Sequence, residues 1–543
     1  MYNVIATLFS IIIPIIILRK DFRKKDNILS CIKENRLIIF AYIIFVIGFL
    51  TRFIGIVNFP NGLNTDEASI GYEAYSVLNY GIDRNANSYP VFLEAWGSGQ
   101  NALYMYIIIP FVKILGLNIL SVRLPMAIIG CTSLIIMYKL LLKMEKKKFA
   151  VLGLAFFAIT PWHIMKSRYG LESNVFPDFT LYAVYFIISA LKEKKCWKFY
   201  LGAVFLGLCS YSYGTSYYFL PIFVIILLTL LLIKKKIKIK EGVCFLGIVF
   251  IISFPIVLMI LINTFKLKEI HIGKITIPRL TQNRYEELTV LSSENIIITL
   301  WQNFYNSLKM LLLQTDGYNS NSLEFFGIIY IFSFPIAIIG GITSFKRKEE
   351  SNTIFNIWFI VAFLLTLICK PNINRMNILY VPVIFYTIIG IYEIVSTFKW
   401  AKSVLFLLYL VSFIIFEITY FNTDTTKTYT FSNGIQNVIQ YTKNVKADSI
   451  YFEYSFKEPY IYILFFNQGD TREFIKTVKH KNNIKTFNSV TEFGKYKFYL
   501  PKRIEQNENS CYIMTKKTKK KYKIDENIWK ITYIDNFCVL ERK

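Results

Sequence analysis

The sequence has few of the residues that bind metals or carry redox chemistry. Its three histidines, His163, His271 and His480, are too few and too scattered for a histidine-rich metal site. The eight cysteines form no CxxC pair and lie mostly in or beside apolar runs, which argues against a zinc or dithiol framework. A metal, if one is used, would have to be held by carboxylates.

Two cysteines differ from the rest. Cys511 and Cys538 fall on strand-like segments of the polar C-terminal region, and both a disulfide and two free thiols are compatible with their spacing. We expect no secretory signal peptide, because the first apolar run, residues 5–18, has its positive charges after it rather than before it. We expect this run to span a membrane with its N-terminus outside.

Charge is scarce as well, but its distribution is informative. Only 18% of the residues are charged and 54% are hydrophobic, with many apolar runs near the roughly 20 residues that cross a bilayer. These values predict an α-helical polytopic membrane protein. The net charge of +26 resides largely in short loops at one end of the predicted helices, so we interpret it as cytoplasmic orientation charge and expect no nucleic-acid partner. The loops are KDFRKKD, MEKKK, KEKKCWK, KKKIKIK and KRKEE.

The number of spans between two of these loops must be even if both loops lie in the cytoplasm, and this condition fixes the topology. If the loop at 19–33 is inside, the run 37–57 leaves the cytoplasm and the next segment is external. One of the two apolar segments before the loop at 139–148 then cannot cross. We expect 103–117 to lie at the outer interface, because it is short and contains Pro110 and Lys113. About twelve spans are predicted, near 5–18, 37–57, 124–142, 149–163, 175–191, 199–214, 217–233, 243–263, 325–344, 354–369, 376–395 and 403–420.

Three domains are expected. Residues 1–35 hold an additional N-terminal span and a basic loop, 36–420 a transmembrane catalytic module, and 421–543 a small external α/β domain. Alternating strand-like segments in the last domain are SIYFEYSF, YIYILFF, KYKFYL and WKITYI, with a helix over 435–446. The lysine-rich stretch 515–523 is either a solvated hairpin edge or loop, or a contact for anionic wall polymer or lipid headgroups.

Carboxylates gather in the first outer loop, 58–101, which follows directly on an apolar run. They are Asp66, Glu67, Glu73, Asp83 and Glu94. A carboxylate beside a bilayer is costly unless it is hydrated, paired or used. A solvated loop explains Glu73 and Glu94, a helix cap at TDEAS is an alternative for Asp66, and solvated surface is an alternative for Glu67.

Two other outer segments bring cations to the same level. WHIMKSRYGLESN contains Lys166, Arg168, Glu172 and Asn174, and KPNINRMNILYVP contains Asn374 and Arg375. Carboxylates and cations together suit a lipid phosphate whose headgroup is transferred: a carboxylate removes a proton from an acceptor hydroxyl, and guanidinium groups neutralise the departing phosphate. For each arginine alone, an anchor at the membrane interface is an equal explanation.

Five blocks, in this order, resemble one family over roughly residues 37–420. They are LNTDEASIGYEAYSVLNYGIDRNANSYPVFLEAWGSGQNALYMYIIIPF, GLNILSVRLP, SRYGLESNVFP, YSYGTSYYFLP and NRMNILYVPVIFYTIIGIYE. The family is the bacterial GT-C membrane glycosyltransferases related to protein O-mannosyltransferases and the aminoarabinose transferase of lipid A. The resemblance implies a polyprenyl-phosphate-sugar donor and an inverting transfer on the outer face. The N-terminal span and the C-terminal domain have no firm counterpart in the simplest members, which leaves the acceptor open.

The resemblance also implies roles for single residues. Asp66 is the expected base or acceptor-binding carboxylate, and Glu67 assists it. The candidate substrate-binding residues are Arg84 in the first block, Arg168, Glu172 and Asn174 in the block that borders the donor site, and Arg375 in the block near the lipid phosphate. Partly re-entrant helices of the first loop would form the floor of a cavity.

Two further features have open interpretations. Tyr213 belongs to an aromatic patch with Tyr211, Tyr217 and Tyr218, which is either an interfacial belt or a platform for a sugar ring. The segment 264–324 is long enough to be a lid, with Arg279 and Arg284 as phosphate contacts.

The leading hypothesis is therefore an inverting glycosyltransferase that passes one sugar from a polyprenyl-phosphate carrier to a wall polymer, lipid or protein outside the cell. No cofactor is required, because a phosphate already leaves well; a divalent ion held by Asp66 and Glu67 is the alternative. A transporter or flippase of lipid-linked saccharides would need ionisable groups deep in several spans, which only Asp178 and Glu417 approach. A membrane-anchored sensor would leave the outer carboxylates unexplained.

Overall fold

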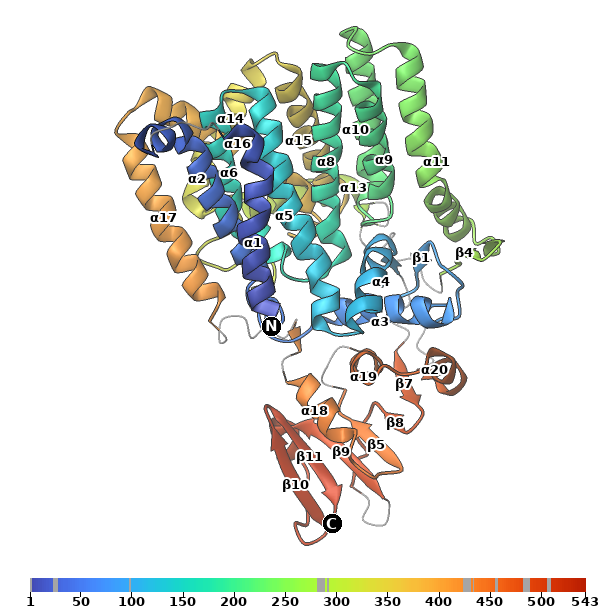
Figure 1. Ribbon diagram of the computed structural model, residues 1–543. Coiled ribbons are helices and arrows are strands. Elements are labelled where there is room, and N and C mark those ends of the chain that lie inside the picture. Colours follow the sequence, from blue (N-terminus) through green and yellow to red (C-terminus); the bar gives the residue numbers. More distant parts are fainter. Residues whose placement is uncertain are drawn as a thin grey trace. The chain divides into compact units, whose positions relative to one another are not determined.

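The computed structural model describes residues 2–22, 28–96, 99–280, 289–290, 293–422, 431–432, 434–454, 458–481, 489–504 and 509–543 (Figure 1). The chain forms two compact units, each built from three separate segments. Unit 1 is Met1–Ile56, Arg123–Pro255 and Tyr285–Thr426. Unit 2 is Val57–Val122, Ile256–Arg284 and Lys427–Lys543. The second unit therefore joins the predicted first outer loop to the predicted C-terminal domain.

Unit 1 is helical. Its helices, with α5 and α11 also carrying the chain between the units, are α1 Tyr2–Leu18, α2 Ile28–Phe53, α5 Ile119–Met144, α6 Lys147–Ile159, α7 Pro161–Lys166, α8 Glu172–Glu193, α9 Cys196–Cys209, α10 Ser216–Ile233, α11 Ile239–Thr264, α13 Ile296–Leu313, α14 Phe334–Lys346, α15 Glu350–Ile368, α16 Asn377–Thr397 and α17 Ala401–Tyr420. In the part of the chain that is described, nine helices are long and apolar enough to cross a membrane. They are α1, α2, α5, α8, α10, α11, α15, α16 and α17. The protein is thus a multi-pass membrane protein, as predicted.

The remaining three expected spans correspond to α6, α9 and α14, which are 13, 14 and 13 residues long. The prediction of a helix over 325–344 is wrong at its start. Residues before Phe334 fold as turns and one short 3₁₀ helix, and Oε1 of Gln314 accepts hydrogen bonds from Ile328 N at 3.0 Å and Ile329 N at 2.9 Å. α14 itself starts with a proline in its first turn, where a missing N–H costs nothing.

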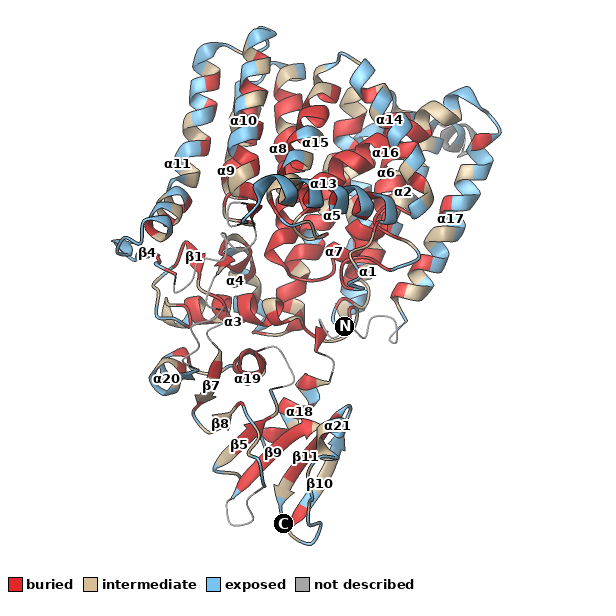
Figure 2. Cartoon of the chain, turned by 180° about the vertical axis from the view of Figure 1, so that it is seen from behind, coloured by how far each residue is buried: buried red, intermediate tan, exposed pale blue. Residues whose placement is uncertain are grey.

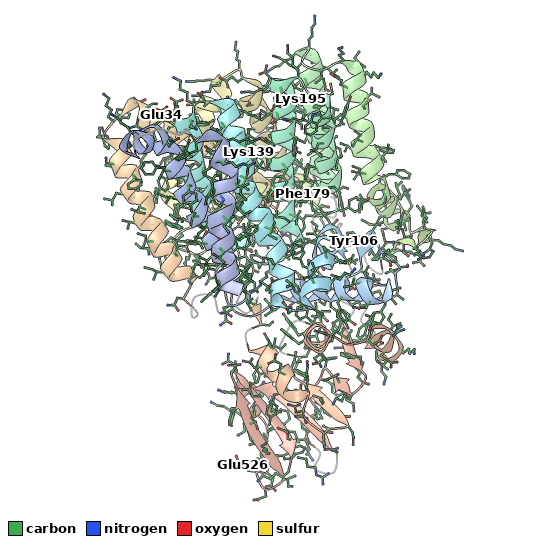
Figure 3. All side chains as sticks on the ribbon, viewed as in Figure 1. Glu34, Tyr106, Lys139, Phe179, Lys195 and Glu526 are labelled. Carbon is green, nitrogen blue, oxygen red and sulfur yellow. The ribbon has the colours of Figure 1, made fainter. Side chains whose placement is uncertain are left out.

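The basic loops meet at one end of unit 1. Lys139 and Lys195 both lie toward this end in Figure 3. Arg347, after α14, lies 3.2 Å from Glu145 after α5 and 2.6 Å from Glu393 near the end of α16. The gathering of these loops is the arrangement that the charge parity predicts for one face of a membrane.

The helices of unit 1 differ sharply in burial (Figure 2). In the most apolar 18-residue stretch of each helix, 83% of the residues are buried in α8 and 78% in α16, but only 28% in α11 and 17% in α17. α8 and α16 are therefore central helices, whereas α11 and α17 present apolar side chains outward, as lipid-facing helices do. α16 packs closely on α14, where a Cβ at Gly340 would come within 1.7 Å of Tyr386 O. Small residues at such crossings let helix backbones approach.

Unit 2 begins with two helices and two hairpins. They are α3 Thr65–Tyr80, α4 Leu103–Leu115, β1 Phe92–Leu93 with β2 Gln100–Asn101, and β3 Ile270–Ile272 with β4 Ile275–Ile277. α3 ends at Gly81, whose φ of +71° is a left-handed cap that glycine adopts without strain. α4, the segment predicted not to cross, is a helix of 13 residues. The hydroxyl of Tyr104 in α4 donates to Val122 O at 2.6 Å.

The C-terminal part of unit 2 is an α/β domain, as predicted. A seven-stranded sheet has the order β10-β11-β9-β5-β8-β7-β6, in which β5 is parallel to both of its neighbours and the other pairs are antiparallel. Its strands are β5 Ser449–Phe452, β6 Lys479–His480, β7 Val490–Phe493, β8 Tyr496–Lys497, β9 Ser510–Thr515, β10 Trp529–Ile534 and β11 Phe537–Arg542. The helices are α18 Ile435–Thr442, α19 Pro459–Asn467, α20 Thr471–Thr477 and α21 Lys516–Lys519.

One prediction for this domain is wrong, and one open question is answered. YIYILFF is not a strand but the helix α19, in which every residue from Pro459 to Phe465 is buried, so no alternating pattern could mark it. A proline in its first turn fixes the start of the helix. The disulfide considered for Cys511 and Cys538 is not formed; both are free thiols buried in β9 and β11. The lysine-rich stretch contains α21, a single helical turn in which Lys516 and Lys517 are exposed.

The segment 264–324 is not one structureless lid. It contains the β3–β4 hairpin of unit 2 and the helix α13 of unit 1. Large apolar side chains project outward along one stripe of α13, and they include Ile297, Trp301 and Tyr305. Spacings of four residues place these side chains on one face, which is typical of an amphipathic helix at a membrane surface.

Candidate active site

α3 begins with a capping box between Asn64 and Glu67. The side chain of Asn64 accepts a hydrogen bond of 2.8 Å from Asp66 N, and Glu67 Oε2 accepts one of 3.0 Å from Asn64 N. Such bonds satisfy backbone N–H groups that lack a partner within the helix. The cap considered for Asp66 is therefore wrong, because Asn64 occupies that position. Solvated surface is also wrong for Glu67, which is fully buried.

Asp66 differs from Glu67 because its carboxylate stays partly exposed. It lies in the first turn of α3, at the positive end of the helix dipole. Trp96 Nε1 donates a hydrogen bond of 3.0 Å to Asp66 Oδ1. Trp96 has a φ of +58°, a left-handed backbone conformation that costs a bulky residue about 1–3 kcal/mol. The loop thus holds the indole N–H of a residue with a strained backbone against Oδ1 of the carboxylate, and among the described residues Oδ2 has no hydrogen-bond partner.

Arg84 and Glu73 form a buried ion pair behind this indole. Arg84 NH1 lies 3.2 Å from Glu73 Oε1 and donates to Ser69 Oγ at 2.8 Å, while Arg84 N donates to Glu73 Oε2 at 2.9 Å. The guanidinium carbon lies 5.0 Å from the centre of the Trp96 ring. One indole therefore links Arg84 to Asp66. The prediction that Glu73 is a solvated loop residue is wrong, since its side chain is 1% exposed.

The same loop contains two carboxyl groups with raised pKa values. Burial raises the pKa of Glu73 to about 7, against the opposing effect of the Arg84 charge. Burial also raises the pKa of Asp83 to about 6, although Asp83 Oδ1 accepts hydrogen bonds from Asn87 N at 2.8 Å and Asn85 N at 2.9 Å. Carboxyls with such values can titrate near neutral pH.

Two tyrosines of α19 complete this side of unit 2. The ring of Tyr460 lies 6.2 Å from that of Trp96 and 5.9 Å from the guanidinium carbon of Arg84. The hydroxyl of Tyr462 lies 3.0 Å from Thr65 Oγ1, at the first turn of α3. The C-terminal domain therefore contributes directly to the surroundings of Asp66.

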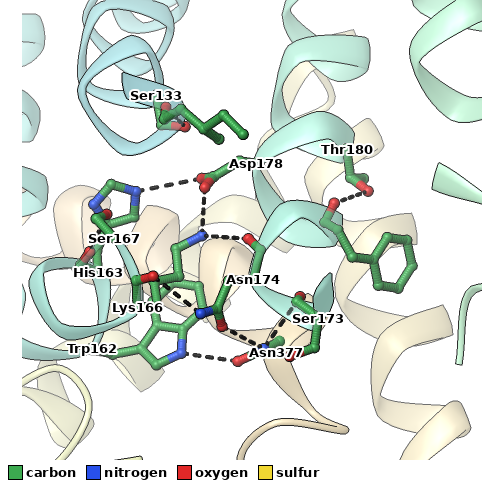
Figure 4. A network of polar contacts seen from close by, with 12 residues as sticks. Ser133, Trp162, His163, Lys166, Ser167, Ser173, Asn174, Asp178, Thr180 and Asn377 are labelled. Atoms are coloured by element: carbon green, nitrogen blue, oxygen red, sulfur yellow. Dashed lines mark hydrogen bonds and ion pairs between the residues drawn. The ribbon is translucent and has the colours of Figure 1, made fainter. Parts of the chain in front are cut away.

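Unit 1 contains a separate buried polar network (Figure 4). Lys166 Nζ lies 2.8 Å from Asp178 Oδ2, and His163 Nε2 lies 3.4 Å from Asp178 Oδ1. Arg52 NH2 lies 2.6 Å from His163 Nδ1. Because an arginine only donates, Nδ1 is the acceptor, and Nε2 carries the proton that faces Asp178.

Asn174 holds this network to its neighbours. Its Nδ2 donates to Lys166 O at 3.1 Å, and its Oδ1 lies 3.5 Å from Asn377 Nδ2. Asn377 Oδ1 in turn accepts a hydrogen bond of 3.0 Å from Trp162 Nε1. These contacts join α7, α8 and α16, as Figure 4 shows.

Arg168 is fully buried and bound to backbone and rings. Its NH1 donates to Thr51 O at 2.6 Å, and its NH2 donates to Ile54 O at 2.7 Å. Its guanidinium carbon lies 4.6 Å from the centre of the Phe421 ring. These contacts tie the end of α2 to the residue after α17. A fully buried guanidinium is not the anchor at the membrane interface that was the alternative for this arginine. Binding of a lipid phosphate by Arg168 stays a prediction.

The predicted site residues fall into two groups. Unit 2 holds Asp66, Glu67 and Arg84; unit 1 holds Arg168, Glu172, Asn174, Tyr213 and Arg375. Glu172 is nearly buried at the first residue of α8, where the helix dipole favours a carboxylate. Arg375 is half-buried and donates to Lys370 O at 3.0 Å, and Tyr213 is half-buried in the turn after α9. Arg279 is exposed, and Arg284 lies outside the described residues.

Within the ranges that the structure describes, no three or more His, Cys, Asp or Glu side chains are grouped so as to hold a metal ion. Glu67 is occupied by the capping box, and one oxygen of Asp66 by Trp96. A divalent ion at this pair stays a prediction.

The sequence reasoning missed Asn64, Trp96 and the two tyrosines of α19. Asn64 could have been found, because the spacing Asn-x-x-Glu is a capping-box pattern. Trp96 and Tyr462 carry no local signal: their role depends on contacts with residues 30 and 397 positions away.

The fold is that of known GT-C proteins. Residues 101–260 match the family model described as dolichyl-phosphate-mannose-protein mannosyltransferase. The chain is similar to the crystal structure of ArnT from Cupriavidus metallidurans in the apo state, with a TM-score of 0.57 and 10% identity over 94% of this chain and 98% of that one. For the same protein bound to undecaprenyl phosphate, the TM-score is 0.55, with 9% identity over 93% and 98%.

A second fold relative is the Archaeoglobus fulgidus oligosaccharyltransferase tethered with an acceptor peptide. The TM-score is 0.51 and the identity 12% over 80% of this chain, which spans 64% of the length of that relative. No curated protein sequence matches the chain. These likenesses confirm the predicted fold class, an α-helical GT-C membrane protein with an additional sheet domain.

Proposed function

We propose that the protein is an integral membrane glycosyltransferase in which Asp66 is the base. The strongest support is the difference between the two acidic residues at the start of α3. Glu67 is buried in a capping box, whereas Asp66 is partly exposed and accepts a hydrogen bond from Trp96. The hydrogen bond from Trp96 fixes the direction in which the Asp66 carboxylate points. The match of residues 101–260 to a mannosyltransferase family model supports the same activity class.

The proposed reaction is one inverting displacement. Asp66 Oδ2 accepts the proton of an acceptor hydroxyl while the hydroxyl oxygen forms a bond to the anomeric carbon of the donor sugar. The bond between that carbon and the phosphate oxygen breaks, and its electron pair leaves with the phosphate. The products are the glycosylated acceptor, the polyprenyl phosphate and a proton on Asp66, which passes to solvent.

The proposed donor is a sugar carried on a polyprenyl phosphate. Support comes from the fold shared with a protein whose structure contains bound undecaprenyl phosphate. Arg375, half-buried after α15, and Arg168 are the candidate phosphate contacts in unit 1, and Tyr213 is the candidate sugar platform. Arg84 acts near the base, through the ring of Trp96.

The proposed site faces outward. The basic loops of unit 1 meet at one end, the end expected in the cytoplasm. α2 starts after the basic loop at 19–33, which is expected in the cytoplasm. Residues 54–64 connect the other end of α2 to α3. Asp66 therefore follows the end of α2 that leaves the cytoplasm. Cysteine placed at position 66 should react with a membrane-impermeant maleimide added outside whole cells, and labelling only after lysis would contradict this orientation.

The central test is Asp66→Asn. The variant should reach the membrane, keep its thermal midpoint in detergent and bind undecaprenyl phosphate, but lose the surface glycan that mass spectrometry detects only in cells with the protein. Glu94→Gln, an isosteric change at a half-buried carboxylate of the same loop, is the matched control and should keep the glycan. Retention of the glycan by Asp66→Asn would end the proposal.

A transporter or flippase of lipid-linked saccharides is the second candidate. Buried ionisable groups on several helices favour it, namely Arg52 on α2, Asp178 on α8 and the neighbouring Lys166. This candidate predicts that Asp66→Asn leaves glycan export unchanged and that Asp178→Asn abolishes it. The sugar and the acceptor follow from the same glycan analysis. A chelator added to membranes tests the metal: continued transfer in EDTA supports the metal-free displacement.

A further inference from the structure

One face of α3 is packed against the C-terminal part of unit 2. Gly71 marks the closest approach, because a Cβ there would come within 2.7 Å of a ring carbon of Phe465 in α19 and 2.6 Å of Val122. The hydroxyl of Tyr72 donates to Gly469 O at 2.9 Å, and Thr471 Oγ1 donates to Ser76 Oγ at 2.7 Å. Helix α3 is therefore fixed along its length by the domain that follows the last span.

At the N-terminal end of α3, the contact with the C-terminal domain is made by one hydroxyl group, that of Tyr462. Tyr462 Oη lies 3.0 Å from Thr65 Oγ1 and 2.8 Å from Ser432 Oγ, and it donates to Leu63 O at 3.2 Å. A phenol has one proton to give and two lone pairs to accept with. Donation to Leu63 O and acceptance from Thr65 and Ser432 satisfy it completely. Tyr462 is fully buried, so water cannot replace these bonds.

These bonds bracket the proposed base. Leu63 and Thr65 flank the N-cap Asn64, whose side chain receives the N–H of Asp66. The position of the Asp66 backbone thus depends on a three-residue segment that Tyr462 holds from both sides. A base works only within hydrogen-bond reach of its proton, and a displacement of about 1 Å can lower a rate about 100-fold.

We infer that Tyr462 is a positioning residue for Asp66, and that the C-terminal domain serves the transfer reaction by holding the first turn of α3 in place. This inference rests on the proposed function of Asp66. The C-terminal domain then has a role in the reaction without contacting the substrate. The domain fixes the position of the Asp66 carboxylate, and Asp66 removes the proton.

The test compares two buried tyrosines that bind α3 to the same domain. Tyr462→Phe removes the hydroxyl at the first turn, and Tyr72→Phe removes one six residues after Asp66, about 9 Å further along the helix. Both changes delete one oxygen from a buried polar contact, so both should lower the thermal midpoint in detergent by a similar amount. Only Tyr462→Phe should reduce the protein-dependent glycan, by about tenfold or more per molecule of membrane protein.

Binding of undecaprenyl phosphate to the purified protein is the second readout, and it should be the same for both variants and the wild type. A second pair of variants tests the contact between Tyr462 and Thr65 by changing Thr65. Thr65→Ser keeps the hydroxyl that faces Tyr462 and should keep the glycan, whereas Thr65→Val removes it and should reproduce the loss.

Equal glycan levels in Tyr462→Phe and Tyr72→Phe would overturn the inference. If Tyr462→Phe fails to bind undecaprenyl phosphate or to accumulate, the Thr65 pair decides: equal glycan in Thr65→Ser and Thr65→Val overturns it, and loss in Thr65→Val alone supports it. The proposed function fails separately, by retention of the glycan in Asp66→Asn. Loss in Asp66→Asn with no effect of Tyr462→Phe and Thr65→Val would leave the base assigned and remove only the positioning role.

Discussion

Trp96 Nε1 and Asp66 Oδ1 lie 3.0 Å apart in a donor–acceptor pair that crosses the first loop of unit 2. The indole also lies against the guanidinium group of Arg84, so a single side chain contacts both the exposed carboxylate and the buried cation. Trp96→Phe keeps an aromatic ring beside Arg84 but removes the N–H. We expect the protein-dependent glycan to fall about tenfold, because Asp66 loses the bond that orients it.

Undecaprenyl phosphate binding should be unchanged in Trp96→Phe, since the indole belongs to the group around the base. Wild-type glycan levels in this variant would show that the hydrogen bond does not orient a working carboxylate. A variant with lost lipid binding would instead place Trp96 in the donor site.

A pH dependence follows from Glu73. Burial raises its pKa to about 7 in the folded protein from 4.5, against Arg84 and beside Asp83 and Tyr460. Between these values the folded state binds more protons at Glu73 than the unfolded state does, so the contribution of Glu73 to stability is lost as pH rises from about 4.5 to 7. The contribution is about 1–3 kcal/mol.

Glu73→Gln keeps an oxygen for Arg84 N but cannot ionise. Thermal midpoints in detergent, measured from pH 4.5 to pH 7.5 for both proteins, should fall more steeply with pH in the wild type than in the variant. Parallel curves would contradict the raised pKa.

The Lys166–Asp178 pair predicts a strong coupling in unit 1. Both side chains are buried, so Lys166→Met leaves an unpaired carboxylate and should cost about 3–5 kcal/mol of stability. The double variant Lys166→Met with Asp178→Leu removes both charges and should be more stable than Lys166→Met alone. Thermal unfolding in detergent checks this order. Additive losses would show that the two charges do not depend on each other.

The α14–α16 crossing offers two adjacent glycines as a matched pair. A Cβ at Gly340 would meet Tyr386 O at 1.7 Å, whereas at Gly341 it would meet the Tyr386 ring at 3.6 Å, an ordinary contact. Gly340→Ala should therefore cost about 1–3 kcal/mol through overpacking, and Gly341→Ala should be nearly neutral. Thermal midpoints of the two variants test the crossing; equal values would contradict it.

Much of the membrane part was predictable from the sequence. Long apolar runs predicted the helices: the structure has a helix in each of the twelve predicted segments, and among the described residues nine of these helices are long and apolar enough to cross a membrane. A span must satisfy its backbone within one helix, so its signal is local. The prediction was weakest at 325–344, where a turn is stabilised by the side chain of Gln314, a contact that no local pattern reveals.

The candidate site was only half predictable. The acid pair, Asp66 and Glu67, stands out because charges are rare beside an apolar run, but its members have different roles that the sequence could not separate. The burial of Glu67 and the orientation of Asp66 depend on the capping box and on Trp96. Trp96 lies 30 residues after Asp66 in the sequence, so no local pattern reveals this contact.

By itself, then, the sequence determined the class of protein, its spans and the segment that carries the acid pair, because hydropathy and charge act locally along the chain. Only the tertiary structure decided that YIYILFF is the helix α19 and that its Tyr462 binds the first turn of α3. The reason is physical: a segment buried on all sides has no periodicity to read, and a hydrogen bond across 397 residues exists only once the chain has folded.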